Sequence, residues 1–231
     1  LDGKYRVVTS SHQEARHFID LGGYEKEMIY ICGLPKFDRN IRYNDADKIV
    51  IMPTWRPWEY NEARYDFEET KYYKMLCRIF AGIPEELHEN IIILPHPLFF
   101  DAVKDAEFPM KKYFNCETKY DDILKTAKIL ITDYSSISYD AFYRGCNVIF
   151  YWEEKDECLE MYGPSTKLML NHENAFGDIC YSTADLNKIM KENYEKPQKE
   201  EYINRYRKLV EFHDGKNTKR LIDLMKADEI I

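Results

Sequence analysis

The stretch Ile129 to Arg144, ILITDYSSISYDAFYR, decides the fold. Its apolar start has the β-branched composition of a strand, and its end has the spacing of a helix. An apolar strand that leads directly into a helix is typical of a parallel sheet whose two faces are both covered. The stretch therefore predicts one βα unit of such a sheet.

The same alternation of short apolar runs and longer amphipathic segments continues on both sides of this unit. We expect strands at 5–9, 28–32, 48–52, 91–94, 128–132 and 147–151. We expect helices at 13–21, 67–81, 121–127, 137–144 and 185–194, and two charged helices at about 197–228 that break near Asp214-Gly215. Surface loops are expected at 56–66 and 101–119. The pattern predicts an α/β protein with a Rossmann-like, doubly wound parallel sheet, and residues 1–231 are treated as a single domain.

Composition excludes several classes of protein. The 231 residues include 33 basic and 41 acidic ones, and 33 − 41 gives a net charge of −8, which argues against a nucleic-acid partner. The six cysteines contain no C-x-x-C pair and are expected to be buried thiols of a reducing cytosol. The sequence has no G-x-G-x-x-G, no P-loop and no metal-ligand spacing, so we expect neither a metal nor a cofactor.

Two of the predicted strands end in side chains suited to phosphate. The strand at 48–52 leads into Pro53-Thr54-Trp55-Arg56, where the fork of Arg56 can match paired phosphate oxygens. The strand at 91–94 leads into Pro95-His96-Pro97, where His96 can donate a hydrogen bond or a proton. A surface arginine beside a packed tryptophan, and a structural histidine, are the alternatives at these two positions.

The segment after the strand at 128–132 resembles an anion site most closely. Free N–H groups at the start of a helix attract anions, and the hydroxyls of Ser135 and Ser136 add donors. Asp140, one helical turn beyond Ser136, can accept hydrogen bonds from ligand hydroxyls. The alternative is that Asp133 or Ser135 only caps the helix.

Two further turns contribute weaker signals. The turn at 33–38 carries the cation Lys36, and the turn at 214–218 can present a second helix start to a ligand or merely separate two helices.

Taken together, these motifs resemble the CDP-glycerol glycerophosphotransferases of teichoic acid synthesis, a GT-B-type family. The resemblance rests on GLPKFD at 33–38, PTWR at 53–56, HP at 96–97, ITDYSSISYD at 131–140 with VIFY at 148–151, and DGKNTKR at 214–220. It implies the carboxy-terminal, donor-binding half of such a transferase. The reaction would be attack of an acceptor hydroxyl on the glycerol-bearing phosphorus of CDP-glycerol, or of a related CDP-alditol, with release of CMP.

The resemblance also implies roles for particular residues. His96 would be the catalytic group that stabilises charge on the diphosphate, without a metal. Lys36, Thr54, Arg56, Ser135, Ser136 and Asp140 would bind the donor.

This chain departs from the family pattern at two places. Lys36 stands where family members carry an arginine, and the amino-terminal half with a W-H-G-T-P-type segment, which supplies the base and most of the acceptor site, is not in this sequence. We therefore expect the chain alone to bind donor but to turn it over poorly or not at all.

The resemblance further implies a lipid-linked polymer acceptor and a cytoplasmic location at the inner face of the bacterial membrane. A GT-B glycosyltransferase domain that uses a nucleotide sugar and a non-catalytic nucleotide-binding module are the alternatives. The oligomeric state is left open.

Overall fold

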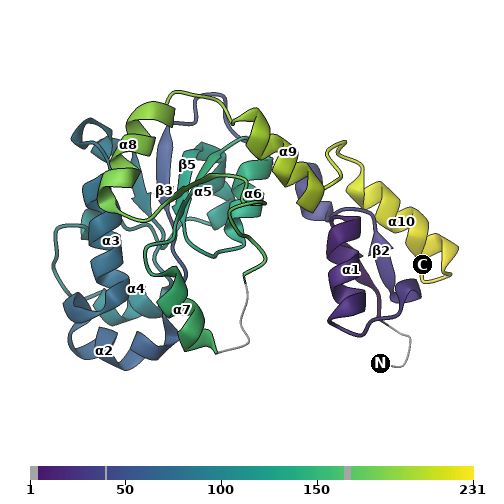
Figure 1. The fold of residues 1–231 in the computed structure, drawn as a ribbon, viewed down its shortest axis with the longest axis horizontal. Helices are drawn as coiled ribbons and strands as arrows, with labels where there is room; N and C mark the ends of the chain where they lie inside the picture. The colour runs from purple at the N-terminus through teal and green to yellow at the C-terminus, as the bar shows by residue number, and fades with distance from the viewer. Residues whose placement is uncertain (1–4, 40, 164–167) are drawn as a thin grey trace. The chain divides into compact units, whose positions relative to one another are not determined.

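The computed structural model describes residues 5–39, 41–163 and 168–231. The contacts divide the chain, which the sequence analysis treats as one domain, into two compact units. The first unit consists of Leu1–Ile41 and Lys199–Ile231, and the second of Arg42–Gln198. Figure 1 shows their helices and strands.

The first unit is built on one βαβ arrangement. Strands β1 (Val7–Thr9) and β2 (Ile29–Ile31) pair in parallel, and helix α1 (His12–Asp20) runs between them in the sequence. The unit also contains α9 (Glu200–Leu209) and α10 (Asn217–Ala227), the two charged helices predicted for this part of the sequence. Helix α1 begins after Ser11, whose hydroxyl accepts a hydrogen bond from the N–H of Glu14.

The second unit contains a five-stranded parallel sheet formed by described residues, with the order β4-β3-β5-β6-β7. The strands are β3 (Lys48–Ile51), β4 (Ile91–Ile93), β5 (Ala127–Thr132), β6 (Asn147–Tyr151) and β7 (Asp178–Cys180). Ile51 lies beside Ile93 on one side and beside Ile131 on the other, and all three side chains are fully buried. This burial explains the uninterrupted apolar runs of the sequence.

Helices cover both faces of this sheet. The helices of the unit are α2 (Tyr60–Tyr65), α3 (Lys71–Gly82), α4 (Pro97–Val103), α5 (Tyr120–Thr126), α6 (Ile137–Tyr143), α7 (Lys155–Tyr162) and α8 (Thr183–Asn193). Helices α3 and α8 pack together on one side of the strands, and α5 and α6 lie on the other side (Figure 1). The doubly wound parallel sheet predicted from the sequence is confirmed.

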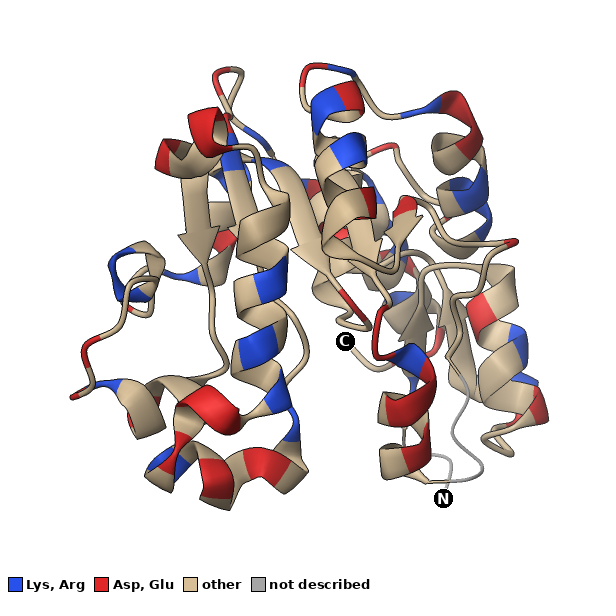
Figure 2. Ribbon diagram, turned by 60° about the vertical axis from the view of Figure 1, so that its left-hand side comes forward, with Lys and Arg blue, Asp and Glu red and all other residues tan. Residues whose placement is uncertain are grey.

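Charged residues are found mainly in the helices and loops, and the strands contain few of them (Figure 2). In the part of the chain that the structure describes, no helix combines the length and the apolar character needed to span a membrane. The predicted place at the membrane surface remains a prediction.

The local structure differs from the sequence expectations at five places. The helix expected at 67–81 begins only after Thr70, whose hydroxyl accepts from the N–H of Tyr73, and a short 3-10 turn precedes it. The loops expected at 56–66 and 101–119 hold all of α2 and the end of α4. Helix α7 and strand β7 were not predicted. In α7 only Cys158 is buried, and β7 has only three residues, so neither has an apolar pattern long enough to read.

Candidate functional site

The order of the strands places one switch point in the sheet of the second unit. From β3 the chain passes to β4 on one side, and it then returns to β5 on the other side. In doubly wound sheets, ligands bind outside the carboxyl ends of the strands at such a point. The loops that begin at Pro53 and Asp133 follow these two strands, so the sheet brings Thr54 and Ser135 to the same edge.

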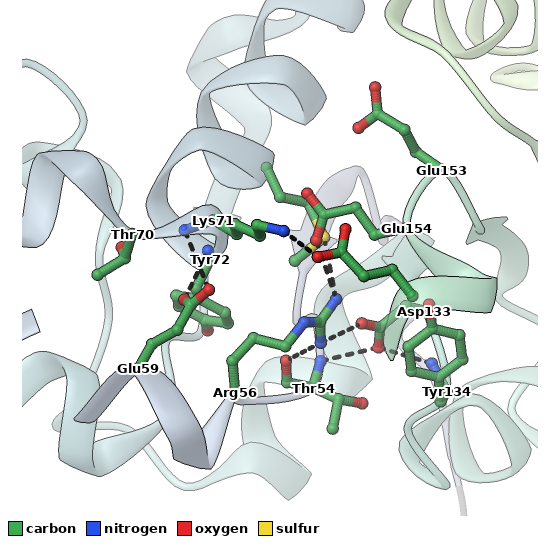
Figure 3. A network of polar contacts seen from close by, with 12 residues as sticks. Thr54, Arg56, Glu59, Thr70, Lys71, Tyr72, Asp133, Tyr134, Glu153 and Glu154 are labelled. Carbon is green, nitrogen blue, oxygen red and sulfur yellow. Dashed lines mark hydrogen bonds and ion pairs between the residues drawn. The ribbon is translucent and has the colours of Figure 1, made fainter. Parts of the chain in front are cut away.

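Asp133 ties the two loops of the switch point together (Figure 3). Its Oδ1 accepts hydrogen bonds from the N–H groups of Thr54, at 2.8 Å, and Tyr134, at 2.6 Å. Its Oδ2 accepts from an Nη of Arg56 at 2.9 Å, and both side chains of this ion pair are almost completely buried. The indole Nε1 of Trp152, just after β6, donates to the carbonyl of Asp133 at 3.0 Å. Asp133 therefore joins the ends of β3, β5 and β6, and we call this set of contacts the Asp133 clasp.

Arg56 is directed into the protein. Besides Asp133, its guanidinium contacts the carbonyl of Thr54 at 2.5 Å and lies 3.7 Å from a carboxylate oxygen of Glu154. Burial alone would lower the pKa of Arg56, but the charge of Asp133 raises it overall, so the group stays charged. Arg56 therefore organises the loops of the switch point. Its predicted contact with a phosphate stays a prediction.

His96 is held at the end of β4 by three contacts. Its Nδ1 accepts a hydrogen bond from the N–H of Leu98 at 3.2 Å, which caps α4. Its own N–H donates to the hydroxyl of Tyr72 at 3.3 Å, and its ring stacks on that of Trp55, with 5.8 Å between centroids and 12° between planes. Burial lowers the pKa of the imidazole below its ordinary value.

These contacts decide which ring nitrogen of His96 carries the proton. Because Nδ1 accepts a hydrogen bond, the neutral ring must carry its hydrogen on Nε2. This Nε2 has no hydrogen-bond partner among the described residues. His96 therefore offers one fixed, uncharged N–H donor.

The segment Ser135-Ser136 precedes α6 and combines two kinds of group. The hydroxyl of Ser135 accepts from the N–H of Ile137 at 3.4 Å, so the capping alternative holds for this side chain. The N–H groups of Ser135 and Ser136, and the exposed hydroxyl of Ser136, have no partner within the part of the chain that is described. Asp140 is half-buried in the first turn of α6. Two consecutive free amides thus lie at the same sheet edge as His96.

Thr54 has one satisfied and one unsatisfied group. Its N–H belongs to the Asp133 clasp, whereas its hydroxyl is buried and has no hydrogen-bond partner among the described residues. A buried hydroxyl without a partner is costly, and such groups are found where a ligand or a water completes the site.

The remaining predicted residue, Lys36, belongs to the first unit. It lies exposed in a 3-10 turn, Pro35–Arg39, with its Nζ 5.1 Å from the centroid of the Phe37 ring. In the same turn the carboxylate of Asp38 accepts from the N–H groups of Asn217, at 2.9 Å, and Thr218, at 2.7 Å. The start of α10, one possible anion site in the sequence, is thus occupied by Asp38.

Two contacts of the site were not expected from the sequence. Asp133 was considered only as a helix cap, and the support of His96 by Tyr72 was not considered. No local sequence signal pairs Asp133 with Arg56, since the contact joins residues 77 positions apart. No sequence signal pairs Tyr72 with His96, since the contact depends on how α3 packs. Among the described residues, no group of three or more His, Cys, Asp or Glu side chains could hold a metal ion.

The sheet and its polar switch point define a Rossmann-like α/β protein. The sequence matches the family described as CDP-Glycerol:Poly(glycerophosphate) glycerophosphotransferase over residues 4–226, and the chain belongs to that family. One curated relative is the minor teichoic acid biosynthesis protein GgaB of Bacillus subtilis (strain 168). It is 27% identical over 236 residues, which cover 93% of this chain and 25% of GgaB.

Solved structures of the wall teichoic acid polymerase TagF have the same fold. A TagF variant soaked with CDPG for 15 minutes is 22% identical and gives a TM-score of 0.70, covering 96% of this chain and 57% of that one. Another structure of TagF gives 18% identity and a TM-score of 0.68 with the same coverage. The likeness confirms the GT-B-type fold expected from the sequence. The chain spans only about a quarter of GgaB and little more than half of TagF.

Proposed function

We propose that this chain binds CDP-glycerol, or a related CDP-alditol, as the donor in a glycerophosphotransferase reaction of teichoic acid synthesis. Its family and its likeness to TagF, which was solved with CDPG, support the choice of donor. The observation that carries the proposal is the set of unpartnered donors at the carboxyl edge of the sheet. The Nε2–H of His96 and the N–H groups of Ser135 and Ser136 are fixed there by the backbone around them.

These donors suit the charge that develops in the reaction. The acceptor oxygen forms a bond to the glycerol-bearing phosphorus, and the bond from that phosphorus to the bridging oxygen breaks, so that CMP leaves with the electron pair. Fixed N–H groups stabilise negative charge most effectively when they need not reorient as it develops. His96 donates through Nε2 to a diphosphate oxygen, and the Ser135 and Ser136 amides bind neighbouring oxygens. The Asp133 clasp keeps the two loops in register.

Two other predicted residues of the second unit complete the proposed site. The unsatisfied hydroxyl of Thr54 forms a hydrogen bond with the donor, and the carboxylate of Asp140 accepts hydrogen bonds from the glycerol hydroxyls. Lys36, in the first unit, stays a predicted donor-binding residue. The acceptor is a lipid-linked polymer at the inner face of the membrane. The catalytic base that takes the proton of the acceptor hydroxyl is not among these residues.

Two substitutions of His96 distinguish the roles of its two ring nitrogen atoms. His96→Asn keeps an acceptor at the position of Nδ1 and therefore keeps the cap of α4, but it removes the Nε2 donor. His96→Gln keeps an amide donor near the position of Nε2. We expect His96→Asn to weaken CDP-glycerol binding about tenfold, the effect of one charge-assisted hydrogen bond, and His96→Gln to retain more of the affinity.

Isothermal titration calorimetry on the 231-residue chain measures these affinities, and CMP release measures turnover. We expect binding with little release of CMP from the chain alone. Absence of CDP-glycerol binding would overturn the proposed donor site. A full transferase rate from this chain would refute the claim that the acceptor base lies elsewhere.

A further inference from the structure

The ring of His96 lies against an aromatic cluster in the second unit. Trp55, Tyr72 and Phe99 form this cluster, and they come from the loop after β3, from α3 and from α4. The ring of Trp55 lies edge-on to that of Tyr72, with 5.2 Å between centroids, and both rings pack on Phe99, at 5.8 Å and 4.8 Å. All three residues are at most 5% exposed. Packing of this density leaves the ring of Trp55 little freedom to turn.

The backbone on both sides of Trp55 is also held. The preceding residue, Thr54, donates its N–H to Asp133, and the following residue, Arg56, forms an ion pair with the same carboxylate (Figure 3). The Asp133 clasp therefore fixes the chain around Trp55 at the end of β3. Because the ring of Trp55 stacks on that of His96, it extends the clasp to the end of the neighbouring strand, β4.

The indole N–H of Trp55 does not explain where its ring lies. Its Nε1 is buried and has no hydrogen-bond partner among the described residues. Buried tryptophans usually find such a partner, and an unsatisfied buried donor is costly. The Nε1 of Trp152, by contrast, donates to the carbonyl of Asp133. The contacts that account for the position of the Trp55 ring are therefore those of its faces and edges.

Two contacts together give the Nε2–H of His96 one direction. The torsion that turns an imidazole ring about its Cβ–Cγ bond has a broad energy profile, so it does not fix the ring by itself. The hydrogen bond from the N–H of Leu98 to Nδ1 decides which edge of the ring faces α4, but at 3.2 Å it is long. The stack on Trp55, with 12° between the planes, holds the plane of the ring.

We infer that Trp55 is a positioning residue for the donor, and that its ring face holds the imidazole of His96 so that Nε2–H meets a diphosphate oxygen. The inference rests on the proposed function, because it gives Trp55 an effect on donor binding through His96. The effective feature is the aromatic face and not the indole N–H, and Trp55 itself does not contact the donor.

Two substitutions of Trp55 distinguish its ring face from its N–H. Trp55→Leu removes the face, whereas Trp55→Phe keeps an aromatic face without the N–H. We expect Trp55→Leu to weaken CDP-glycerol binding about three- to tenfold, the effect of having to order one more side chain, and Trp55→Phe to retain most of the affinity. The matched control is Trp58→Leu, since Trp58 lies outside the aromatic cluster and packs edge-on against Tyr162, at 5.2 Å. It should leave the affinity unchanged in calorimetry on the 231-residue chain.

A double substitution tests whether Trp55 acts through His96. If it does, Trp55→Leu should cause no further loss of affinity in the His96→Asn chain, which has no Nε2 donor to position. If Trp55 only supports the fold of its loop, the loss should be the same in both backgrounds. Equal losses would therefore refute the inference, even if Trp55→Leu is also less stable than the wild type.

The ring nitrogen atoms of His96 give a readout that does not depend on the donor. At about pH 7.5 the ring is neutral, because burial lowers the pKa of His96, and a fixed tautomer gives two well-separated ¹⁵N signals. The spectrum of His96→Asn, which lacks these signals, identifies them among the six histidines. Trp55→Leu should bring the two signals closer together, because a ring that turns away from the N–H of Leu98 exchanges between its tautomers. Trp58→Leu should not.

The outcomes separate this inference from the proposed function. If CDP-glycerol binds but Trp55→Leu binds it as tightly as Trp58→Leu, or if Trp55→Phe loses as much affinity as Trp55→Leu, the positioning role is refuted and the donor site stands. If CDP-glycerol does not bind but Trp55→Leu brings the two ¹⁵N signals together, Trp55 positions His96 and the proposed donor is wrong. If neither is observed, both are overturned.

Discussion

Removing the charge of Asp133 should destabilise the second unit strongly. Asp133→Asn leaves an oxygen for the N–H groups of Thr54 and Tyr134 but withdraws the negative charge from Arg56, which is 2% exposed. Loss of one partner from a buried ion pair costs about 3–5 kcal/mol, because the remaining charge stays buried without compensation. The contacts of Arg56 with the carbonyl of Thr54 and with Glu154 remain, so we expect the lower end, about 3 kcal/mol.

Urea unfolding followed by tryptophan fluorescence measures this loss. All three tryptophans, Trp55, Trp58 and Trp152, lie in the second unit, so the signal reports on the unit that contains the substitution. The matched control is Glu107→Gln, which breaks an ion pair of 3.0 Å with Lys111 in which the Glu107 side chain is 89% exposed. It should cost less than about 1 kcal/mol.

A double substitution tests the reason for the loss. If the cost of Asp133→Asn comes from an uncompensated charge on Arg56, adding Arg56→Met should recover part of it, since no buried charge then remains. A single substitution that costs no more than Glu107→Gln would refute the buried ion pair. A double variant whose loss is the sum of the two single losses would refute the electrostatic explanation.

Three other outcomes are expected. Gly33→Ala should loosen the first unit, because Gly33 has a φ of +80° and an added methyl would meet the side chain of Asn217; faster hydrogen exchange in α10 measures this. Trp152→Phe removes the hydrogen bond to the Asp133 carbonyl and should cost about 1–3 kcal/mol in urea unfolding, and no loss would contradict the contact. Because burial lowers the pKa of His96, the unfolded chain binds its proton more readily than the folded one. The stability that His96 contributes is therefore complete above about pH 6.5 and is lost as the pH falls below it. Wild type should lose more stability between pH 7.5 and 5.5 than His96→Asn. Equal losses would show that protonation of His96 does not cause the loss.

The long apolar strands could be predicted from the sequence because their burial on both faces leaves an unmistakable pattern. Strands β3 and β5 carry runs of Ile, Val and Leu, and the structure places them at the centre of the sheet. Strand β7 lies at the edge and has only one buried residue, Cys180, so the burial that creates such a pattern is missing. Helix α4 begins at Pro97, which is favoured at the first position of a helix but was interpreted only as a rigid strand end.

The candidate site could be predicted by position but not by the direction of its side chains. Parallel strands place their carboxyl ends at one edge, so the sequence was sufficient to bring Thr54 and Ser135 together. Whether Arg56 faces a ligand or the interior depends on a contact 77 residues away, with Asp133. Local sequence carries no information about such a contact.

The motifs that led to the family are largely occupied with one another. Asp38 of the turn at 33–38 accepts hydrogen bonds from the amino end of α10, and Asp133 accepts one from the guanidinium of Arg56. In both pairs, an acidic side chain binds the group that the sequence alone would assign to a phosphate. At the sheet edge of the second unit, the groups that remain for a ligand are uncharged donors, chiefly the Nε2–H of His96 and the amides of Ser135 and Ser136. The amides of Ser135 and Ser136 follow Asp133, which the ion pair with Arg56 fixes in place, and His96 is held by its own contacts. These donors can therefore stabilise charge as it develops without first being freed from a counterion. The buried ion pair of Arg56 and Asp133 thus serves the proposed chemistry by holding the loops, and its removal should affect stability and donor binding together.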